Sequence, residues 1–336
     1  MTKLGDIGED SAISWISEFL GKPRGVTVPV GDDAAVIPFG DSFLTICTDM
    51  IQEGIHIYPG MTPFQTGRKA AVVNFSDLAS MGASPKGFLL SLGVGKNYPL
   101  EAFKEIFRGA ESACREAGAK FLGGDMNSSE KLILDGVAFG EIKNKDDVMR
   151  RGGAKDGDIV AVTGPLGGAA CGWQILTNNL DLTGFSPKER GSIEKWAIGS
   201  CRDPKARVKE GKLLARSGGV TSCTDISDGL AYSLGYMSKA SSCGFEIIEE
   251  RVPVREATKL VCTEFDLDLK EMTYNIGEDF ELLCTIRKES WKKLKKKLPC
   301  LTEIGRVVPG KEIRLIGKGG KISKLEAKGY NHFNQS

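Results

Sequence analysis

Apolar residues recur along the first half of the chain in runs that predict three helices and four strands. Residues Glu9–Leu20 follow the pattern of an amphipathic helix. Two longer helical patterns, Pro63–Met81 and Leu100–Ala117, alternate with short apolar runs that are typical of strands. The predicted strands are Phe43–Cys47, Gly87–Val94, Ala119–Leu122 and Leu132–Ile142.

The same alternation continues after a polar run, Lys143–Asp147, which is the best candidate for a linker. The predicted strands of this half are Ile159–Thr163, 221–226 and Glu281–Ile286, and the predicted helices are Gly167–Leu176, 204–217, 228–242 and Glu289–Leu298. Strands mixed with helices in both halves predict two α/β (α+β) domains. We expect them to span residues 1–145 and 146–336, which also suits a length of 336 residues.

Composition and charge exclude several function classes. The chain has 45 basic and 44 acidic residues, a formal charge of +1, which argues against nucleic acid or an anionic membrane as partner. No apolar run approaches the roughly 18 residues of a membrane-spanning helix. The opening residues MTKLGDIGEDS lack the apolar stretch of a signal peptide, so we expect a cytoplasmic location.

The residues present also limit which kinds of zinc site or catalytic nucleophile the chain could contain. Nine cysteines form no CxxC pair, so zinc-ribbon spacing is absent. Only two histidines are present, His56 and His332, and no GxSxG motif occurs. We therefore expect no side chain to act as a nucleophile or a general base.

Aspartates beside glycine or small residues are the informative feature. They occur in Gly31-Asp32-Asp33-Ala34, Thr48-Asp49, Ser76-Asp77, Gly123-Gly124-Asp125, Asp225-Ile226-Ser227-Asp228-Gly229 and Gly277-Glu278-Asp279. Asp77 interrupts a helix that is otherwise nearly all small or apolar, and it shares a face with Asn74. A carboxylate buried there requires a cation or several hydrogen-bond donors.

Several carboxylates that converge in one cleft repel each other, and a hard divalent cation relieves that repulsion. A set rich in Asp and poor in His favours Mg²⁺ or Mn²⁺ over Zn²⁺ or Cu²⁺, and Mg²⁺ also binds substrate phosphates. This combination predicts phosphoryl transfer with a nucleotide. The P-loop GxxxxGK[ST] and the protein-kinase motifs are absent, and the Gly-rich segment Thr163–Gly168 could approach a phosphate or simply form a tight turn.

Taken in order, these motifs resemble the thiamine-monophosphate kinase family, within the aminoimidazole-ribonucleotide-synthetase-like ATP-binding superfamily. The matching segments cover nearly the whole chain: GDDAAV (31–36), TDMIQEGIH (48–56), GRKAAVVNFSDLASMGASP (67–85), GGD (123–125), RGGAKDGDIVAVTGPLGGAACG (151–172), DISDGL (225–230), GEDFEL (277–282) and GYNHF (329–333). The resemblance implies a two-domain fold whose N-terminal domain forms a homodimer interface. It also implies direct, Mg²⁺-dependent transfer from ATP to thiamine monophosphate, which gives thiamine diphosphate and ADP.

The resemblance also implies roles for individual residues. Metal ligands would be Asp32, Thr48, Asp49, Asp77, Asp125, Asp225 and Asp228. ATP contacts would be Gly124, Asp125, Arg151 and Ser227, and substrate contacts would be His56, Glu278 and Tyr330.

Some positions depart from the family pattern. Cys47 stands at a further metal position where Ser or Thr is usual, Met126-Asn127 follow GGD, and Asn331 replaces an Asp. Two alternatives stay open: another ATP-dependent synthetase of the same superfamily, and a catalytically silent nucleotide-binding homologue.

Overall fold

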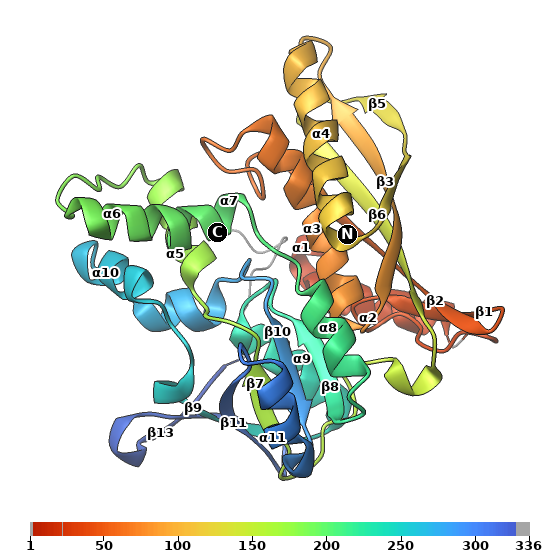
Figure 1. Cartoon of the computed structure of the whole chain (residues 1–336), viewed down its shortest axis with the longest axis vertical. Coiled ribbons are helices and arrows are strands. Elements are labelled where there is room, and N and C mark those ends of the chain that lie inside the picture. Colours follow the sequence, from red (N-terminus) through yellow and green to blue (C-terminus); the bar gives the residue numbers. More distant parts are fainter. Residues whose placement is uncertain (1–2, 22, 327–336) are drawn as a thin grey trace.

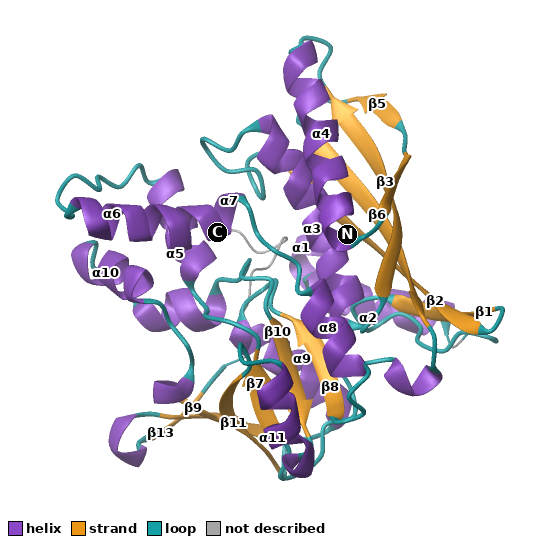
Figure 2. Ribbon diagram, in the orientation of Figure 1, coloured by secondary structure: helices purple, strands orange, loops and turns teal. Residues whose placement is uncertain are grey.

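Two mixed sheets, one in each half of the chain, organise the computed structural model (Figures 1 and 2). The structure describes residues 3–21 and 23–326. The first sheet ends at Ile142 and the second begins at Ile159, so the predicted two-domain α/β (α+β) architecture is confirmed. The boundary between residues 145 and 146 stays a prediction.

The N-terminal sheet has the strand order β1-β2-β6-β3-β4, with the short β5 paired to β3. Its strands are β1 (Ala35–Phe39), β2 (Ser42–Gln52), β3 (Ser84–Val94), β4 (Lys120–Gly123), β5 (Met126–Ser128) and β6 (Ile133–Ile142). Strands β1, β2, β6 and β3 pair antiparallel, whereas β3 pairs parallel with β4 and β5. The helices of this half are α1 (Leu4–Ile7), α2 (Glu9–Leu20), α3 (Pro63–Ser80), α4 (Leu100–Ala117) and the 3-10 helix η1 (Lys145–Asp147).

Helices α3 and α4 cover one face of this sheet, and no helix of the described residues 3–21 and 23–326 covers the other (Figure 1). Along β2 the side chains alternate, so Cys47 and Ile51 are buried toward α3 while Ile46 and Met50 are 38% and 54% exposed on the other face. Leu89 of β3 and Leu122 of β4 add exposures of 37% and 55%. The uncovered face of the N-terminal sheet therefore presents four apolar side chains, beside the polar pair Thr48 and Asp135.

Helix α3 begins at a capping box and is then buried on nearly every side. The Thr62 hydroxyl accepts a hydrogen bond from the Gln65 N–H at 3.2 Å, and Gln65 Oε1 accepts one from the Thr62 N–H at 3.0 Å. Beyond this cap, 14 of the 18 residues of α3 are buried. Its apolar side chains join one hydrophobic core that also includes Cys223 and Leu282 of the C-terminal half. Helix α3 is thus the element that both domains share.

The C-terminal sheet has the order β13-β12-β9-β11-β7-β10-β8, and only β12 and β9 run parallel. Its strands are β7 (Ile159–Val162), β8 (Val220–Asp225), β9 (Gly244–Ile248), β10 (Leu282–Ile286), β11 (Thr302–Val308), β12 (Ile313–Ile316) and β13 (Ile322–Lys324). The α-helices are α5 (Gly168–Thr177), α6 (Pro187–Ile193), α7 (Gly199–Arg202), α8 (Val208–Ala215), α9 (Leu230–Ser241), α10 (Glu256–Glu264) and α11 (Lys288–Lys297). Short π- and 3-10 helices complete it: η2 (Glu194–Ile198), η3 (Glu249–Arg251), η4 (Glu271–Asn275) and η5 (Lys318–Gly320).

The predicted elements are present, with two kinds of difference. The helix predicted over 204–217 starts only at Val208, because residues 204–207 form an irregular segment in which Arg207 bonds to Glu281. The elements that the sequence analysis did not predict include the helices over 187–202, α10, and strands β1, β5, β9 and β11–β13. Within the described part of the chain, no helix is long and apolar enough to cross a bilayer.

The close crossing of α3 and α4 supplies a stability test. A Cβ at Gly67 would lie 1.8 Å from the carbonyl oxygen of Ile106, and a Cβ at Gly109 would lie 1.9 Å from that of Phe64. We expect Gly67→Ala to lower the free energy of unfolding by about 1–3 kcal/mol, because the helices have to separate. Chemical denaturation measures this change.

Gly191 in α6 is the matched control, because a Cβ there meets no atom within 4 Å. Gly191→Ala should be neutral or stabilising by roughly 0.5–1 kcal/mol. Equal effects of the two substitutions would contradict the close helix crossing.

Candidate active site

Three aspartates from distant parts of the chain meet where the domains join. One carboxylate oxygen each of Asp33, Asp77 and Asp225 lies within 4.8 Å of the other two. Asp33 precedes β1, Asp77 lies near the end of α3, and Asp225 ends β8. Folding therefore brings the predicted Asp77 and Asp225 together, and it adds Asp33, which the sequence analysis did not single out.

Hydrogen bonds from both domains hold Asp33 in this cluster. Asp33 Oδ1 accepts bonds from Arg151 Nε at 2.7 Å and from the Thr224 hydroxyl at 2.9 Å. Its Oδ2 accepts one from the Ser80 hydroxyl of α3 at 2.5 Å. Its side chain is 1% exposed. Such a carboxylate is held firmly in one orientation.

Asp225 is held in a similar way. Its Oδ2 accepts a hydrogen bond from the Ser76 hydroxyl at 2.5 Å, and the residue is 4% exposed. Ser76 and Ser80 are four residues apart on α3, so they lie on one face of that helix. That face orients two members of the acidic cluster.

Asp49 on β2 lies beside the cluster and is positioned through its backbone. The side-chain oxygen of Asn74 accepts a hydrogen bond from the Asp49 N–H at 3.1 Å, and the Asn74 amide donates to the Asp49 carbonyl at 3.3 Å. Asn74 also donates to the carbonyl of Ala70 at 3.0 Å. Asn74 therefore positions Asp49, a role that its i,i+3 spacing from Asp77 did not reveal.

Burial and mutual repulsion disfavour charge on these carboxylates. Burial, with the nearby charge of Asp33, raises the pKa of Asp225 to about 8. Burial raises the pKa of Asp49 to about 6, and burial with the charges of Asp49, Asp225 and Asp33 raises the pKa of Asp77 well above its usual value. Arg151 is the cation that the structure places against this charge, through its contacts with Asp33.

The predicted Asp32 is not a member of the three-carboxylate group. Its oxygens accept hydrogen bonds from the Arg151 N–H at 3.1 and 3.3 Å and from the Asp33 N–H at 3.1 Å. Burial, with the charge of Asp33, raises the pKa of Asp32 to about 7. The two aspartates are adjacent in the Gly31-Asp32-Asp33 motif, so the motif leads to the cluster, and the role of Asp32 as a metal ligand stays a prediction.

Two further predicted residues, Cys47 and Thr48, lie on β2, and their side chains make hydrogen bonds within the protein. The Thr48 hydroxyl donates to Asp135 Oδ1 at 3.0 Å and to the Gly136 carbonyl at 2.9 Å, on the face opposite Asp49. The Cys47 Sγ donates to the Asn74 carbonyl at 3.3 Å. Burial, with the charges of Asp77 and Asp49, raises the pKa of the Cys47 thiol well above its usual value, so it is neutral.

The remaining predicted residues surround the cluster. Ser227 donates to Asp225 Oδ1 at 3.4 Å, and burial with the charges of Glu9 and Asp49 raises the pKa of Asp228 to about 7. Gly124 and Asp125 lie between β4 and β5 on the exposed sheet edge, outside the cluster. A side chain at Gly124 would meet the Leu90 carbonyl oxygen at 1.8 Å, which explains the glycine.

The predicted substrate residues form a second group around Lys69 of α3. Lys69 Nζ donates to Glu278 Oε2 at 2.6 Å and to the carbonyl oxygen of His56 at 2.8 Å. The structure thus brings His56 and Glu278 together through a lysine that the sequence analysis did not select. Tyr330 lies outside the described residues.

The Gly-rich segment before α5 is a capped turn. Asp279 Oδ2 accepts a hydrogen bond from the Gly167 N–H at 2.8 Å, and its Oδ1 accepts one from the Ala169 N–H at 3.4 Å. Burial raises the pKa of Asp279 to about 7. A carboxylate therefore already occupies the helix N-terminus that a phosphate could have used.

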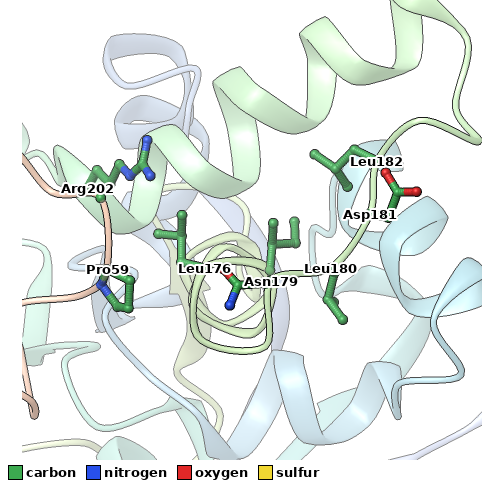
Figure 3. Close-up of a pocket in the computed structure, with 9 residues that line it drawn as sticks. Pro59, Leu176, Asn179, Leu180, Asp181, Leu182 and Arg202 are labelled. Atoms are coloured by element: carbon green, nitrogen blue, oxygen red, sulfur yellow. The ribbon is translucent and has the colours of Figure 1, made fainter.

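A separate pocket of about 460 Å³ lies at the C-terminal end of α5 (Figure 3). Leu176, Leu180 and Pro59 form apolar walls, and Arg202 lies beside Pro59 in this view. No member of the acidic cluster lines it. The chemistry indicated by the aspartates therefore belongs elsewhere.

The raised pKa values of the aspartates predict how stability depends on pH. In a chelating buffer, we expect the free energy of unfolding to fall by at least about 2 kcal/mol between pH 5 and pH 8. Asp49, Asp225 and Asp77 hold protons in the folded state above the ordinary value of about 3.9, so their contribution is lost as pH rises through the folded pKa values. Urea titrations across this range measure it.

Asp77→Asn should flatten this dependence and stabilise the protein at pH 8, because it removes one of the repelling charges. Asp156→Asn, at an exposed turn, is the control and should leave the dependence unchanged. A stability that is flat or rises from pH 5 to pH 8 would contradict the proposed repulsion.

Comparison with known proteins places this geometry in a family. Family models for the N-terminal and C-terminal domains of AIR synthase related protein match residues 31–142 and 155–318. The chain is 33% identical to the thiamine-monophosphate kinase of Pyrococcus horikoshii, with 90% of each chain covered. It is 36% identical to that of Methanospirillum hungatei, with 90% of this chain and 92% of the relative covered.

A solved structure agrees with these relatives. AaThiL complexed with AMPPCP and TMP matches with a TM-score of 0.85 and 29% identity, and 99% of each chain is covered. The predicted family is confirmed: this chain belongs to the thiamine-monophosphate kinase family, built from the N-terminal and C-terminal domains of AIR synthase related proteins.

Proposed function

We propose that this protein transfers the γ-phosphoryl group of ATP to thiamine monophosphate and releases thiamine diphosphate and ADP. The observation that carries the proposal is the cluster of Asp33, Asp77 and Asp225, gathered from both domains in a chain of this family. The relatives are named for this activity, and the AaThiL structure holds AMPPCP and TMP.

The donor set of the cluster suits Mg²⁺. All three groups are carboxylates, Asp49 lies beside them, and the raised pKa values indicate an excess of negative charge that a divalent cation would relieve. Asp33, Asp49, Asp77 and Asp225 are the residues that would hold the metal. The further predicted ligands are Asp32, Thr48, Asp228 and Asp125, of which Asp125 would come from the sheet edge outside the cluster. When bound, Mg²⁺ supplies positive charge to the phosphate oxygens of both substrates.

The acceptor in this reaction needs no proton removed, because it is already a phosphate oxygen with negative charge. The residues of the chain therefore have to orient two anionic groups in line and offset their repulsion. Arg151 offers a planar set of donors, and in the structure it contacts Asp33 at 2.6 and 2.7 Å. A guanidinium in this position can bind the phosphates of ATP while it remains beside the acidic cluster.

The two substrates would approach from different sides of the cluster. Arg151, Ser227 and Gly124 would contact ATP. His56, Glu278 and Tyr330 would contact thiamine monophosphate. The Tyr330 ring would offer an aromatic face to the cationic thiazolium.

A homodimer through the N-terminal sheet is part of the proposal. The uncovered face of that sheet exposes Ile46, Met50, Leu89 and Leu122, and apolar residues gathered in this way are typical of protein interfaces. A second copy of the chain could cover the face with the same residues, as two-fold symmetry requires. A cytoplasmic location stays a prediction.

A turnover assay with ATP and Mg²⁺ tests the reaction. We expect ADP and thiamine diphosphate to form from thiamine monophosphate and no product to form from free thiamine. Asp77→Asn should lower kcat by roughly 100-fold or more, because an oriented ligand carboxylate is lost. We expect Mg²⁺ to raise the unfolding temperature of the wild type, and Asp77→Asn should abolish that rise.

Asp156→Asn serves as control for both readouts. ATP binding without any ADP production would favour the silent homologue, and phosphorylation of free thiamine alone would overturn the substrate. Near-normal turnover by a folded Asp77→Asn variant would remove Asp77 from the proposed ligands.

Leu122→Glu tests the homodimer. The wild-type protein should sediment as a dimer at micromolar concentration, and the substitution should weaken association by roughly tenfold or more, because it places a charge in the apolar face. Leu100→Glu, at the exposed start of α4, should leave the dimer intact. A monomeric wild-type protein would contradict this interface.

A further inference from the structure

Lys69 is the charged residue most completely enclosed by the structure. It is 0% exposed, and its ammonium group donates to the His56 carbonyl at 2.8 Å and to Glu278 Oε2 at 2.6 Å. The ammonium also lies 4.2 Å from the centre of the Tyr58 ring. A buried ammonium is stable only when its donors are satisfied, so these three partners account for its place in the core.

Both partners of Glu278 contact the same oxygen. Oε2 accepts the hydrogen bond from Lys69 and a second one from the Tyr58 hydroxyl at 2.5 Å. Oε1 receives no hydrogen bond from another residue in ranges 3–21 and 23–326, and the side chain is 19% exposed. One oxygen is therefore anchored, and the other is available for a ligand.

The backbone of Glu278 is fixed as well. Its N–H donates to the Ser227 carbonyl at 2.6 Å, and its φ of 66° is unusual for a residue with a side chain. A Cβ at Gly277 would lie 1.8 Å from the same Ser227 carbonyl oxygen, and Asp279 caps α5. A strained backbone held from both sides is typical of a functional position.

We infer that Lys69 and Tyr58 are positioning residues that determine specificity for the nitrogen heterocycle of the substrate, an inference that rests on the proposed function. They hold Glu278 Oε2, so that Oε1 is presented as an anionic acceptor. Such an oxygen selects a ring that carries N–H donors or positive charge, and thiamine has both in its aminopyrimidine and its thiazolium. A ring with only acceptors facing Oε1 would leave it unpaired.

A purely structural role is the competing explanation, because Lys69 on α3 and Glu278 belong to different domains. Arg68, the preceding residue on α3, provides the comparison. Its Nε bonds to Asp203 Oδ1 at 2.7 Å, so that ion pair also joins α3 to the C-terminal half. Asp203 does not contact Glu278, Tyr58 or His56 in any bond that the described residues make. Asp203→Asn therefore breaks a bridge between domains without touching Glu278.

Steady-state kinetics tests the inference, with thiamine monophosphate and ATP varied separately. The variants are Tyr58→Phe, Lys69→Arg, Lys69→Met and Asp203→Asn. Tyr58→Phe removes one hydroxyl and keeps the ring under Lys69. We expect it to raise KM for thiamine monophosphate by roughly fivefold to twentyfold, with kcat and KM for ATP changed less than twofold. Lys69→Met should raise the same KM further, and Lys69→Arg should recover part of the loss.

Tyr58→Phe carries the test if the Lys69 variants do not fold. Asp203→Asn should leave KM for thiamine monophosphate within twofold of wild type. If the wild-type enzyme is active and Tyr58→Phe leaves KM for thiamine monophosphate unchanged, the inference is overturned while the proposed function stands. The same holds if Asp203→Asn raises this KM as much as Tyr58→Phe does. A wild-type protein that does not consume thiamine monophosphate overturns the proposed function, and this inference with it.

Discussion

The burial of helix α3 on almost all of its surface is the constraint on which the rest of the structure depends. A helix in this position can carry polar residues only where another segment supplies a partner. Lys69 meets Glu278, Asn74 meets the backbone of Asp49, Ser76 meets Asp225 and Ser80 meets Asp33. Each partner comes from a different stretch of the chain. The packing of one helix between two domains thus assembles the acidic cluster and the Glu278 group together.

The acidic cluster itself destabilises the folded state. Burial and the charge of Asp33 raise the pKa of Asp77 and Asp225, whose oxygens lie within 4.8 Å of it, and hydroxyl donors and one guanidinium offset only part of the repulsion. A protein selected for stability alone would replace such a group with apolar residues. The proposed metal site accounts for this arrangement, and hydrogen bonds already orient the oxygens of Asp33 and Asp225.

Much of the N-terminal domain and of the acidic cluster could be predicted from the sequence because their signals are local. The periodicity of α2 and α4 gave their limits to the residue, and a carboxylate within the apolar pattern of α3 identified Asp77. Asp33 could not be distinguished from Asp32 by sequence, because both precede the same strand and both accept hydrogen bonds from Arg151, Asp32 from its backbone and Asp33 from its guanidinium. Lys69 lay inside the matched segment 67–85, yet a lysine in a helix usually faces solvent, and no local pattern distinguishes a buried one.

The C-terminal half was less predictable for a physical reason. Strands β9 and β11–β13 are short, and their pairing partners are remote along the chain. The turn before α5 has a clear local signal that fits two structures, because its glycines suit either a bound phosphate or a capped helix start. Asp279, more than a hundred residues away, decides in favour of the cap.

The position of Lys69 relative to Asp77 on α3 has a geometric consequence. Eight residues separate them, which corresponds to about 12 Å along a helix axis. Helix α3 therefore fixes the separation between the proposed ring contact at Glu278 and the proposed metal and phosphate site at the aspartates. A molecule whose ring and phosphate are spaced too closely or too widely could occupy only one end. In the proposed function, the backbone of α3 would therefore select substrates by the distance between their ring and their phosphate, independent of any single contact.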